Sequence, residues 1–374
     1  MSLNGELNIM LHLVKQGEQF ILNDVDIDLA RPNIAQRMLV GQSPQQAITR
    51  INQLMTVCQH AQTAAAKLAL GYQLTAEEAQ NIEYENIEQG FWRLIIDLPK
   101  SFGVELSLEN FIGLRKAIAQ QDRVNIIIFA KQLFLQICQL ESQEFTSLTE
   151  EQFLNWLASV VSPMSSFLKQ VSQLVVKDNC VHFSMLTSFT NDALFAKISE
   201  HLLADEEYCQ RPHLDSKSFE TGSLSLISSH SLVNIFTDMG VAGRFASRLL
   251  YIAQKINKLE DESTKVNVFG TYIPSTHQQT NPHIKQNEVD NGSQLAWVQT
   301  ARGLLIHLAN IQQGEISQYS IIAPTEWNFH PEGALTKILI NSSYNSQQAA
   351  RESARLAVLA LDPCIEFNLG VAYA

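Results

Sequence analysis

Two cysteines far apart in the chain have neighbours that suggest metal chemistry. Cys58 precedes His60 and an alanine-rich stretch, and Cys364 directly follows Asp362-Pro363. Thiolates are good ligands for soft and borderline transition metals. On an apolar helical stripe, however, a cysteine is most often a small buried hydrophobe. Because residues two positions apart on a helix point to different faces, Cys58 and His60 are not expected to share a metal.

The five cysteines stand at positions 58, 138, 180, 209 and 364, and no two of them form a CxxC pair. This spacing excludes a local zinc or iron–sulfur motif. An odd number of cysteines in a long chain, with no secretory signal visible, predicts reduced thiols and a cytoplasmic protein. We interpret Cys138, Cys180 and Cys209 as ordinary core or loop thiols.

The bulk composition is that of a folded globular protein. The 374 residues are 45% hydrophobic and 17% charged, and the formal net charge is −12. The chain has no block of Lys and Arg, which excludes nucleic acid as a partner. No apolar run approaches the ~20 residues that a membrane-spanning helix needs, so we expect no membrane insertion.

Apolar periodicity indicates the elements that would position the cysteines. Alternation within residues 1–30, interrupted by a turn at Lys15-Gln16-Gly17-Glu18, predicts a β-hairpin. From Ser43-Pro44 to about Leu70, apolar spacings of three and four predict one helix that includes Cys58. Residues 31–260 are predicted to be mainly helical. Further helical periodicity is found around 75–95, 107–120, 123–140, 148–177, 191–204 and 228–260.

The last third of the chain mixes loop, strand and helix signals. Residues 261–330 are predicted to be a loop region, with loop or short strands over 261–295, followed by a second hairpin that turns at Gln313-Gly314. Residues 331–374 contain a helix near 345–361, ended by Pro363, and a short tail. Together the patterns predict a mainly helical α+β fold in a single domain over 1–374.

The surroundings of Cys58 resemble a motif of the nickel–iron hydrogenase large-subunit family. The run from Gln53 to Gln62 is similar to R-x-C-G-x-C-x-x-x-H, and Cys58 falls on the second cysteine. Met55 replaces the first cysteine, while Gln53 and Gln62 replace the arginine and the histidine. Upstream, the stretch from Arg31-Pro32 to Ser43-Pro44 is similar to the family's approach to this motif.

The tail resembles the family's second cysteine motif, D-P-C-x-x-C-x-x-H. Cys364 matches the first cysteine, whereas Phe367 and Gly370 replace the second cysteine and the histidine. Three internal segments extend the resemblance to nearly the whole chain, although 75–205 matches by helical character alone. They are Glu220–Leu224 (E-x-G-P-L), Ala301–His307 (A-P-R-G-x-L-x-H) and Ala323–Asn328 (V-P-T-T-W-N).

The resemblance implies that the nickel site is lost. In active members four thiolates hold nickel, and the second cysteine of each pair bridges it to an iron that carries cyanide and carbon monoxide. By this correspondence Cys58 would be a bridging thiolate and Cys364 a terminal one. Met55 is a weak neutral ligand and Phe367 offers no donor atom, so we expect no nickel and no hydrogenase activity. Asn4 would replace a proton-carrying glutamate, and an amide cannot shuttle protons near neutral pH.

By the same resemblance, the residues that hydrogen-bond the ligands of the iron are retained in this chain. In the family, the arginine of the R-G motif and the hydroxyl residue of P-T/S hydrogen-bond the cyanides, and Arg302 and Thr325, after Pro324, stand at these positions. A guanidinium and a hydroxyl suit the acceptor nitrogen of cyanide. The plain alternative is that Arg302 makes an internal ion pair and Thr325 a turn contact. His307, expected on a strand, is interpreted as structural.

These residues predict a degenerate accessory member of the family, of the HupK type, with the large-subunit-like helical core. Such a protein would act in hydrogenase maturation as a transient scaffold for an iron–cyanide–carbonyl fragment, with Cys58 and Cys364 as candidate iron ligands. Its partners would be hydrogenase maturation factors or hydrogenase subunits. Two alternatives stay open: a purely structural or interaction homologue without metal, and a metal or redox enzyme with a repurposed site, including a Cys58–Cys364 disulfide.

Overall fold

The computed structural model describes residues 5–30, 34–97, 106–174, 184–186, 192–261, 268–274 and 292–373. The expected N-terminal hairpin is confirmed, since β1 (Glu6–Gln16) pairs antiparallel with β2 (Gln19–Ala30). Two further strands, β7 (Ser343–Tyr344) and β8 (Phe367–Tyr373), complete a sheet in the order β7-β2-β1-β8. The apolar row of β1 is fully buried against the helices, as its alternation requires.

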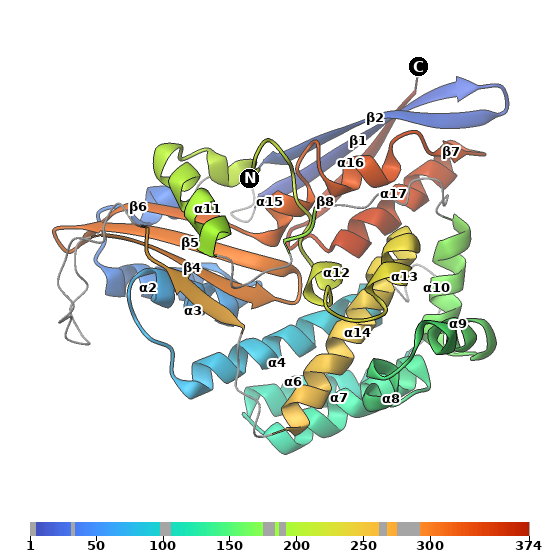
Figure 1. Ribbon diagram of the computed structural model, residues 1–374, viewed down its shortest axis with the longest axis horizontal. Coiled ribbons are helices and arrows are strands. Elements are labelled where there is room, and N and C mark those ends of the chain that lie inside the picture. Colours follow the sequence, from blue (N-terminus) through green and yellow to red (C-terminus); the bar gives the residue numbers. More distant parts are fainter. Residues whose placement is uncertain are drawn as a thin grey trace.

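The expectation of a short tail after the last helix is wrong, because the segment after Cys364 is the strand β8. It runs parallel to β1, with Phe367 opposite Leu7. Phe367, Leu369 and Val371 pack on the core and alternate with polar or small residues, which is a strand pattern. In Figure 1, β8 lies along β1 beside the last helix, α17 (Gln347–Leu361). That helix is close to its predicted bounds.

The second hairpin is also confirmed and belongs to a larger sheet. β5 (Gly303–Gln312) and β6 (Glu315–Ile322) are joined by Gln313 and Gly314, which both have positive φ, as a tight hairpin turn requires. β4 (Gly292–Thr300) and β3 (Phe269–Tyr272) extend it to the order β3-β4-β5-β6. Both faces are buried, one under α3 (Gln59–Ala69) and the other under α11 (Asp192–Ala204), which explains the near-continuous apolar run of β5.

Most helices occupy the predicted ranges, but three predicted helices are interrupted. The first breaks between α2 (Pro44–Leu54) and α3 (Gln59–Ala69). The second breaks before Pro163, which cannot donate a backbone hydrogen bond inside a helix. The third breaks at Gly240, whose φ of 60° is left-handed. The remaining helices of the first half are α1 (Ile34–Leu39), α4 (Ala76–Trp92), α6 (Glu109–Ala119), α7 (Arg123–Cys138), α8 (Ser142–Thr146), α9 (Glu150–Ser159), α10 (Pro163–Leu174) and α11 (Asp192–Ala204).

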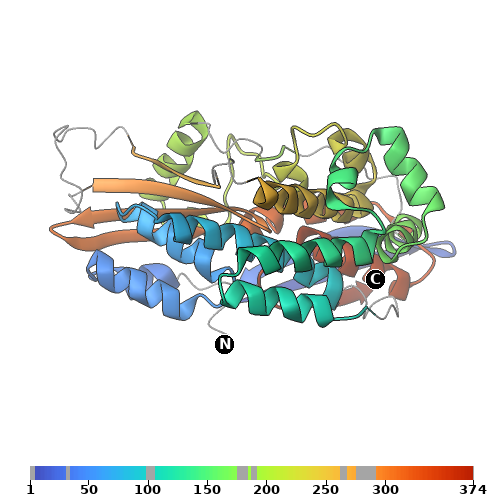
Figure 2. The same ribbon diagram turned by 90° about the horizontal axis from the view of Figure 1, so that it is seen from below.

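The long helix α14 (Gly240–Glu260) lies at the centre of the helical half. It packs against α4, α7, α8, α10 and α17, and Figure 1 shows it crossing this layer. Figure 2 shows α6 and α7 side by side on the flank. Gly243 is required here, because a Cβ atom would lie 1.6 Å from the carbonyl oxygen of Phe236. The shorter elements are η1 (Arg93–Asp97), η3 (Tyr208–Gln210), α12 (Ser223–Leu226), α13 (Val233–Asp238), α15 (Pro324–Asn328) and α16 (Ala334–Leu339).

None of the helices in the described ranges combines the length and the apolar character needed to cross a bilayer.

Candidate functional site

Cys58 lies in the break between α2 and α3, and not inside a helix as its stripe predicted. It is the N-cap residue of α3, with left-handed φ and ψ of 53° and 45°. Its side chain is buried. The break has a tertiary cause: both carboxylate oxygens of Glu85, on α4, accept the free N–H groups of His60 (2.9 Å) and Ala61 (3.0 Å). These donors have no partner within a helix, so an acid placed there stabilises the start of α3.

Cys364 lies in the short connection between α17 and β8. The Thr325 hydroxyl is 3.1 Å from Cys364 Sγ, and Cys364 N donates to the same hydroxyl at 3.3 Å. Pro324 is the first residue of α15, and so it places Thr325 in the first turn of that helix, directly after β6. Both residues are buried. Thr325 therefore makes more than a turn contact, since it bonds to the cysteine from a distant segment.

Arg302 connects the two cysteine segments. It lies in the turn between β4 and β5, where Gly303 has a φ of 126° and a Cβ atom would meet Thr221 Oγ1 at 2.5 Å. Arg302 Nη1 donates to Cys58 Sγ at 3.1 Å, and Nη2 donates to Gln89 Oε1 at 3.0 Å. Its Nε lies 3.5 Å from Asp362 Oδ1, so the expected internal ion pair is present as well as the contact to a thiol.

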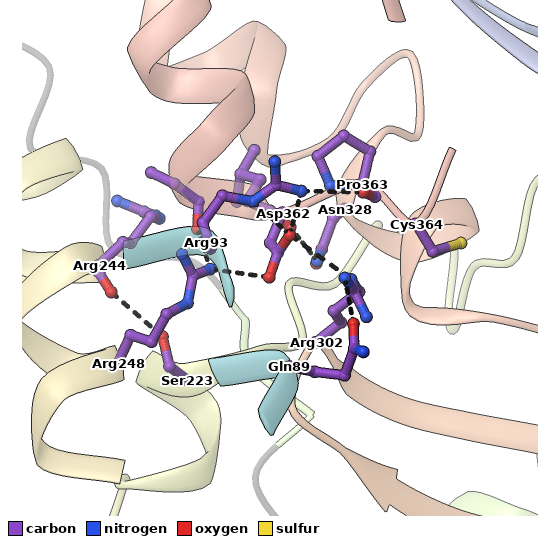
Figure 3. Close-up of polar contacts among 12 residues, drawn as sticks. Gln89, Arg93, Ser223, Arg244, Arg248, Arg302, Asn328, Asp362, Pro363 and Cys364 are labelled. Atoms are coloured by element: carbon purple, nitrogen blue, oxygen red, sulfur yellow. Dashed lines mark hydrogen bonds and ion pairs between the residues drawn. The ribbon is translucent and has the colours of Figure 1, made fainter. Parts of the chain in front are cut away.

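Asp362 is surrounded by guanidinium groups. Arg93 Nε donates to Asp362 Oδ1 at 2.8 Å, and Arg248 Nη2 lies 3.3 Å from Oδ2. Figure 3 shows Arg93 and Arg302 approaching this carboxylate from different elements, with Cys364 just beyond it. Burial acts to raise the pKa of Asp362, but Arg93, Arg302 and Arg248 hold it well below its usual range. The carboxylate is therefore a fixed negative charge beside the thiols.

Burial dominates the chemistry of the Cys58 thiol. It raises the pKa of Cys58 to about 12, even though the Arg302 guanidinium favours the thiolate. The thiol is therefore protonated near neutral pH, and a metal that replaces the proton must bind strongly. A thiolate at Cys364 would further oppose ionisation of Cys58, and thiolates at both positions would favour the charged form of Arg302. The site thus brings together Cys58, Cys364, Arg302, Thr325 and Pro324 in the same region.

The burial of Glu85 leads to a prediction about pH and stability. Burial raises the pKa of Glu85 from 4.5 to about 7, although the backbone hydrogen bonds of Ala61 and His60 oppose the rise. A carboxyl with a raised folded-state pKa contributes stability below its unfolded pKa, and that contribution is lost as pH rises through the folded value. We expect this group to lower the free energy of unfolding by roughly 3 kcal/mol as pH rises over that window. Denaturant unfolding of Glu85→Gln should lack this slope, whereas Glu260→Gln, which removes an acid paired with Lys131 on another face, should keep it. Equal slopes in both variants would contradict the assignment.

Other residues singled out by the sequence are structural or lie outside the described ranges. His307 is buried on β5, and its two ring nitrogens contact Tyr319 Oη (2.8 Å) and Gln62 Oε1 (2.9 Å). Gln62, at the position of the motif histidine, thus takes part in a buried hydrogen bond with His307. The thiols Cys138 and Cys209 are buried, as expected of core residues. Asn4, Arg31, Pro32 and Cys180 lie outside the described residues.

Within the described residues, no group of three or more His, Cys, Asp or Glu side chains is arranged to hold a metal ion. A metal between Cys58 and Cys364 would therefore need further ligands that these side chains do not supply. The residues that surround the thiols without a motif signal are Glu85, Gln89, Arg93 and Arg248. All of them lie on helices, where polar residues are usually solvated, so no pattern in the sequence distinguished them.

Comparison with known proteins gives a consistent relationship. The family model described as nickel-dependent hydrogenase matches residues 217–367, which include Arg302, Thr325 and Cys364. Hydrogenase expression/formation protein HoxV of Cupriavidus necator is 24% identical and covers 91% of each chain. Hydrogenase expression/formation protein HupK of Rhizobium leguminosarum bv. viciae is 26% identical, covering 93% of this chain and 92% of its own.

A solved structure extends the similarity to the fold. The Ni-Fe-Se hydrogenase of Desulfomicrobium baculatum superposes with a TM-score of 0.54 at 14% identity, covering 94% of this chain and 95% of that one. The α+β fold is therefore that of a hydrogenase large subunit. The chain thus resembles nickel-dependent hydrogenases in sequence over residues 217–367 and in fold over most of its length, and its homologues over most of its length are hydrogenase expression/formation proteins of the HupK and HoxV type.

Proposed function

We propose that this protein is an accessory factor of hydrogenase formation that carries an iron–cyanide–carbonyl fragment as cargo between Cys58 and Cys364. The observation that supports this most is the position of Arg302, whose guanidinium bonds to Cys58 and faces the carboxylate two residues before Cys364. Two cysteines from distant parts of the chain therefore meet around one buried hydrogen-bond donor. Its homologues of the HupK and HoxV type are named for hydrogenase formation.

The donor set suits this cargo chemically. Two thiols can supply thiolates to iron, a metal that accepts soft sulfur ligands. Arg302 Nη1 and Thr325 Oγ1 each lie 3.1 Å from one of the two sulfurs, so their N–H and O–H groups would be available to hydrogen-bond the ligands of an iron bound there. Cyanide nitrogen is an anionic acceptor, and charge-assisted hydrogen bonds to it are strong. Carbonyl and cyanide ligands on the iron would complete a coordination shell that the protein alone does not provide.

Nickel chemistry does not suit the same residues. Met55 is the C-cap residue of α2 and offers only a thioether, and Phe367 starts β8 and packs toward the core. Neither residue can supply a thiolate, so the four-sulfur environment of nickel cannot be built. On this basis the protein is an accessory member and not a hydrogenase. Its partners would be the maturation factors that deliver the iron fragment or the hydrogenase subunits that receive it.

Infrared spectroscopy tests the proposal directly. We expect the protein, purified anaerobically from a host with the hydrogenase maturation machinery, to show metal-bound cyanide and carbonyl bands. Cys58→Ala and Cys364→Ala should each remove most of the signal, because one thiolate of the pair is lost. Cys209→Ala, which removes a buried thiol outside the site, should leave the bands unchanged. Bands absent under all conditions would reject the carrier.

The second candidate function is that of an interaction protein without metal. It is favoured by the Arg302–Asp362 ion pair, since this contact satisfies part of the guanidinium without any ligand. On this alternative the two cysteines are remnants of the family's site. The infrared experiment separates the two functions, because an interaction protein would show no metal-bound cyanide or carbonyl bands. In cells, its Cys58→Ala and Cys364→Ala variants would still support hydrogenase formation as well as the wild type does.

A further inference from the structure

Helix α4 and the turn η1 that continues it present three polar side chains at a spacing of four residues. Glu85 and Gln89 lie on α4, where residues four apart share a face, and Arg93 is the first residue of η1. We call these three residues the α4 stripe. A different face of the helix is anchored to the core, because Glu83 pairs with Lys255 of α14 at 2.6 Å and with Lys258 at 3.0 Å. The stripe is therefore held on a fixed helix.

The first residue of the stripe holds the segment of Cys58. Glu85 binds the N–H groups of the first turn of α3, directly after Cys58. The side chain of Cys58 starts from a left-handed backbone conformation, which is costly for a residue with a Cβ atom. The two hydrogen bonds to a carboxylate offset this cost and fix where α3 begins. The position of the thiol thus depends on Glu85.

The other two residues hold Arg302 and the segment of Cys364. Gln89 accepts a hydrogen bond from Arg302 Nη2, which leaves Nη1 directed at Cys58. Arg93 donates to the Asp362 carboxylate and also to the carbonyl oxygen of Pro363 at 3.3 Å, directly before Cys364. At Arg93 the helix changes to the π-helical turn η1, a feature that is common at functional sites.

We infer that the α4 stripe sets the distance between the two thiols, with Glu85 and Arg93 as positioning residues for Cys58 and Cys364 and Gln89 as the positioning residue for Arg302. The geometry supports this because one continuous helical segment, α4 followed by η1, contacts both cysteine segments and the arginine between them. That the distance between the two thiols serves to bind the iron fragment rests on the proposed function. The effect of the stripe on this distance can be tested with another metal.

Binding of Cd²⁺ alone to the purified, reduced protein tests the stripe. Cd²⁺ is a soft cation, and it binds far more tightly to two thiolates at the right spacing than to one. The Cys58→Ala variant measures binding to the remaining thiols, and the difference from the wild type gives the contribution of the pair. The variants are Glu85→Gln, Gln89→Leu and Arg93→Gln, each measured by competition with a chelator above the pKa of Glu85. Glu260→Gln and Lys131→Gln are the controls, because these residues, on α14 and α7, pair with each other at 2.9 Å outside the stripe.

We expect Glu85→Gln and Arg93→Gln each to weaken Cd²⁺ binding at least about tenfold, since each loses hydrogen bonds to or from a charged group that fix a cysteine segment. Their electrostatic effects alone would be opposite: loss of an acid weakens cation binding, and loss of an arginine strengthens it. Gln89→Leu should weaken binding less, because it moves Arg302 and not a sulfur. The controls should match the wild type.

Tighter Cd²⁺ binding by Arg93→Gln would overturn the inference, because electrostatics would then outweigh position. A wild type that binds Cd²⁺ no better than Cys58→Ala would also overturn it, since the two thiols would not form one site. If Arg93→Gln does not fold, Arg93→Lys replaces it. A Cd²⁺ affinity and a thermal stability of Arg93→Lys that both equal those of the wild type would contradict a role for the paired N–H donors of Arg93. Absent infrared bands reject the iron cargo but leave this Cd²⁺ comparison intact.

Discussion

Replacement of Arg302 by leucine is expected to reduce the infrared cyanide signal of the anaerobically purified protein to about a tenth or less, since the charged hydrogen bonds of the site are lost. Arg302 is the residue that bonds to Cys58 and Gln89 and also faces Asp362. The fold should persist, because Asp362 keeps Arg93 and Arg248 as partners. Iron content and the band intensities, both per mole of protein, measure the effect.

Two further variants determine whether the guanidinium acts through its shape or its charge. Arg302→Lys keeps the charge but loses the planar fork, so we expect a weaker signal with shifted cyanide frequencies. Arg115→Leu removes an exposed arginine outside the site and should behave as the wild type. A full signal in Arg302→Leu, with unchanged frequencies, would show that the arginine has only a structural role.

Replacement of Arg244 by leucine is expected to destabilise the protein by about 3–5 kcal/mol, because it leaves the carboxylate of Glu220 buried without its main partner. Arg244 Nε and Nη2 bond to the two oxygens of Glu220 at 2.8 and 2.6 Å, and both side chains are at most 5% exposed. This pair ties α14 to the segment before α12, where the neighbouring Thr221 Oγ1 accepts a hydrogen bond from Leu304 N on β5 at 2.9 Å. Equilibrium denaturation monitored by circular dichroism gives the change.

An exposed ion pair provides the control for Arg244. Arg355 and Glu352 pair on α17 at 2.6 Å, but their side chains remain 28% and 31% exposed. Arg355→Leu should therefore cost no more than about 1 kcal/mol. The double variant Glu220→Leu/Arg244→Leu should recover part of the loss, because no charge is left buried. Equal losses in Arg244→Leu and Arg355→Leu would contradict the assignment.

The sequence predicted the parts of the fold that depend on local periodicity. Alternation marks β1 and β2, and the Gln313-Gly314 turn marks the β5–β6 hairpin, because only a few residue types adopt positive φ without cost. The strand β8 also carries a period-two pattern at Phe367, Leu369 and Val371. This short pattern overlaps the cysteine motif of the tail, which favours a different interpretation of the same residues.

The break before α3 could not be predicted in the same way. Residues 55–58 contain neither Gly nor Pro, and the apolar stripe continues through them. The cause is the carboxylate of Glu85, which comes from another helix and carries no local signal. The members of the candidate site that lie in family motifs could be named from the sequence. Glu85, Gln89 and Arg93 could not, because polar residues on a helix usually face solvent.

The pairing of β8 with β1 has a consequence for how the protein folds. The contact between Asn8 and Asn368 spans 360 positions, and the Arg302–Cys58 contact spans 244. Closing loops of this length costs chain entropy before any contact repays it, so such pairings form late in folding. Cys364 lies immediately before β8 and is fixed only when that strand docks. A nascent or partly folded chain thus presents two separate thiols, and the proposed iron-binding pair exists only in the folded molecule.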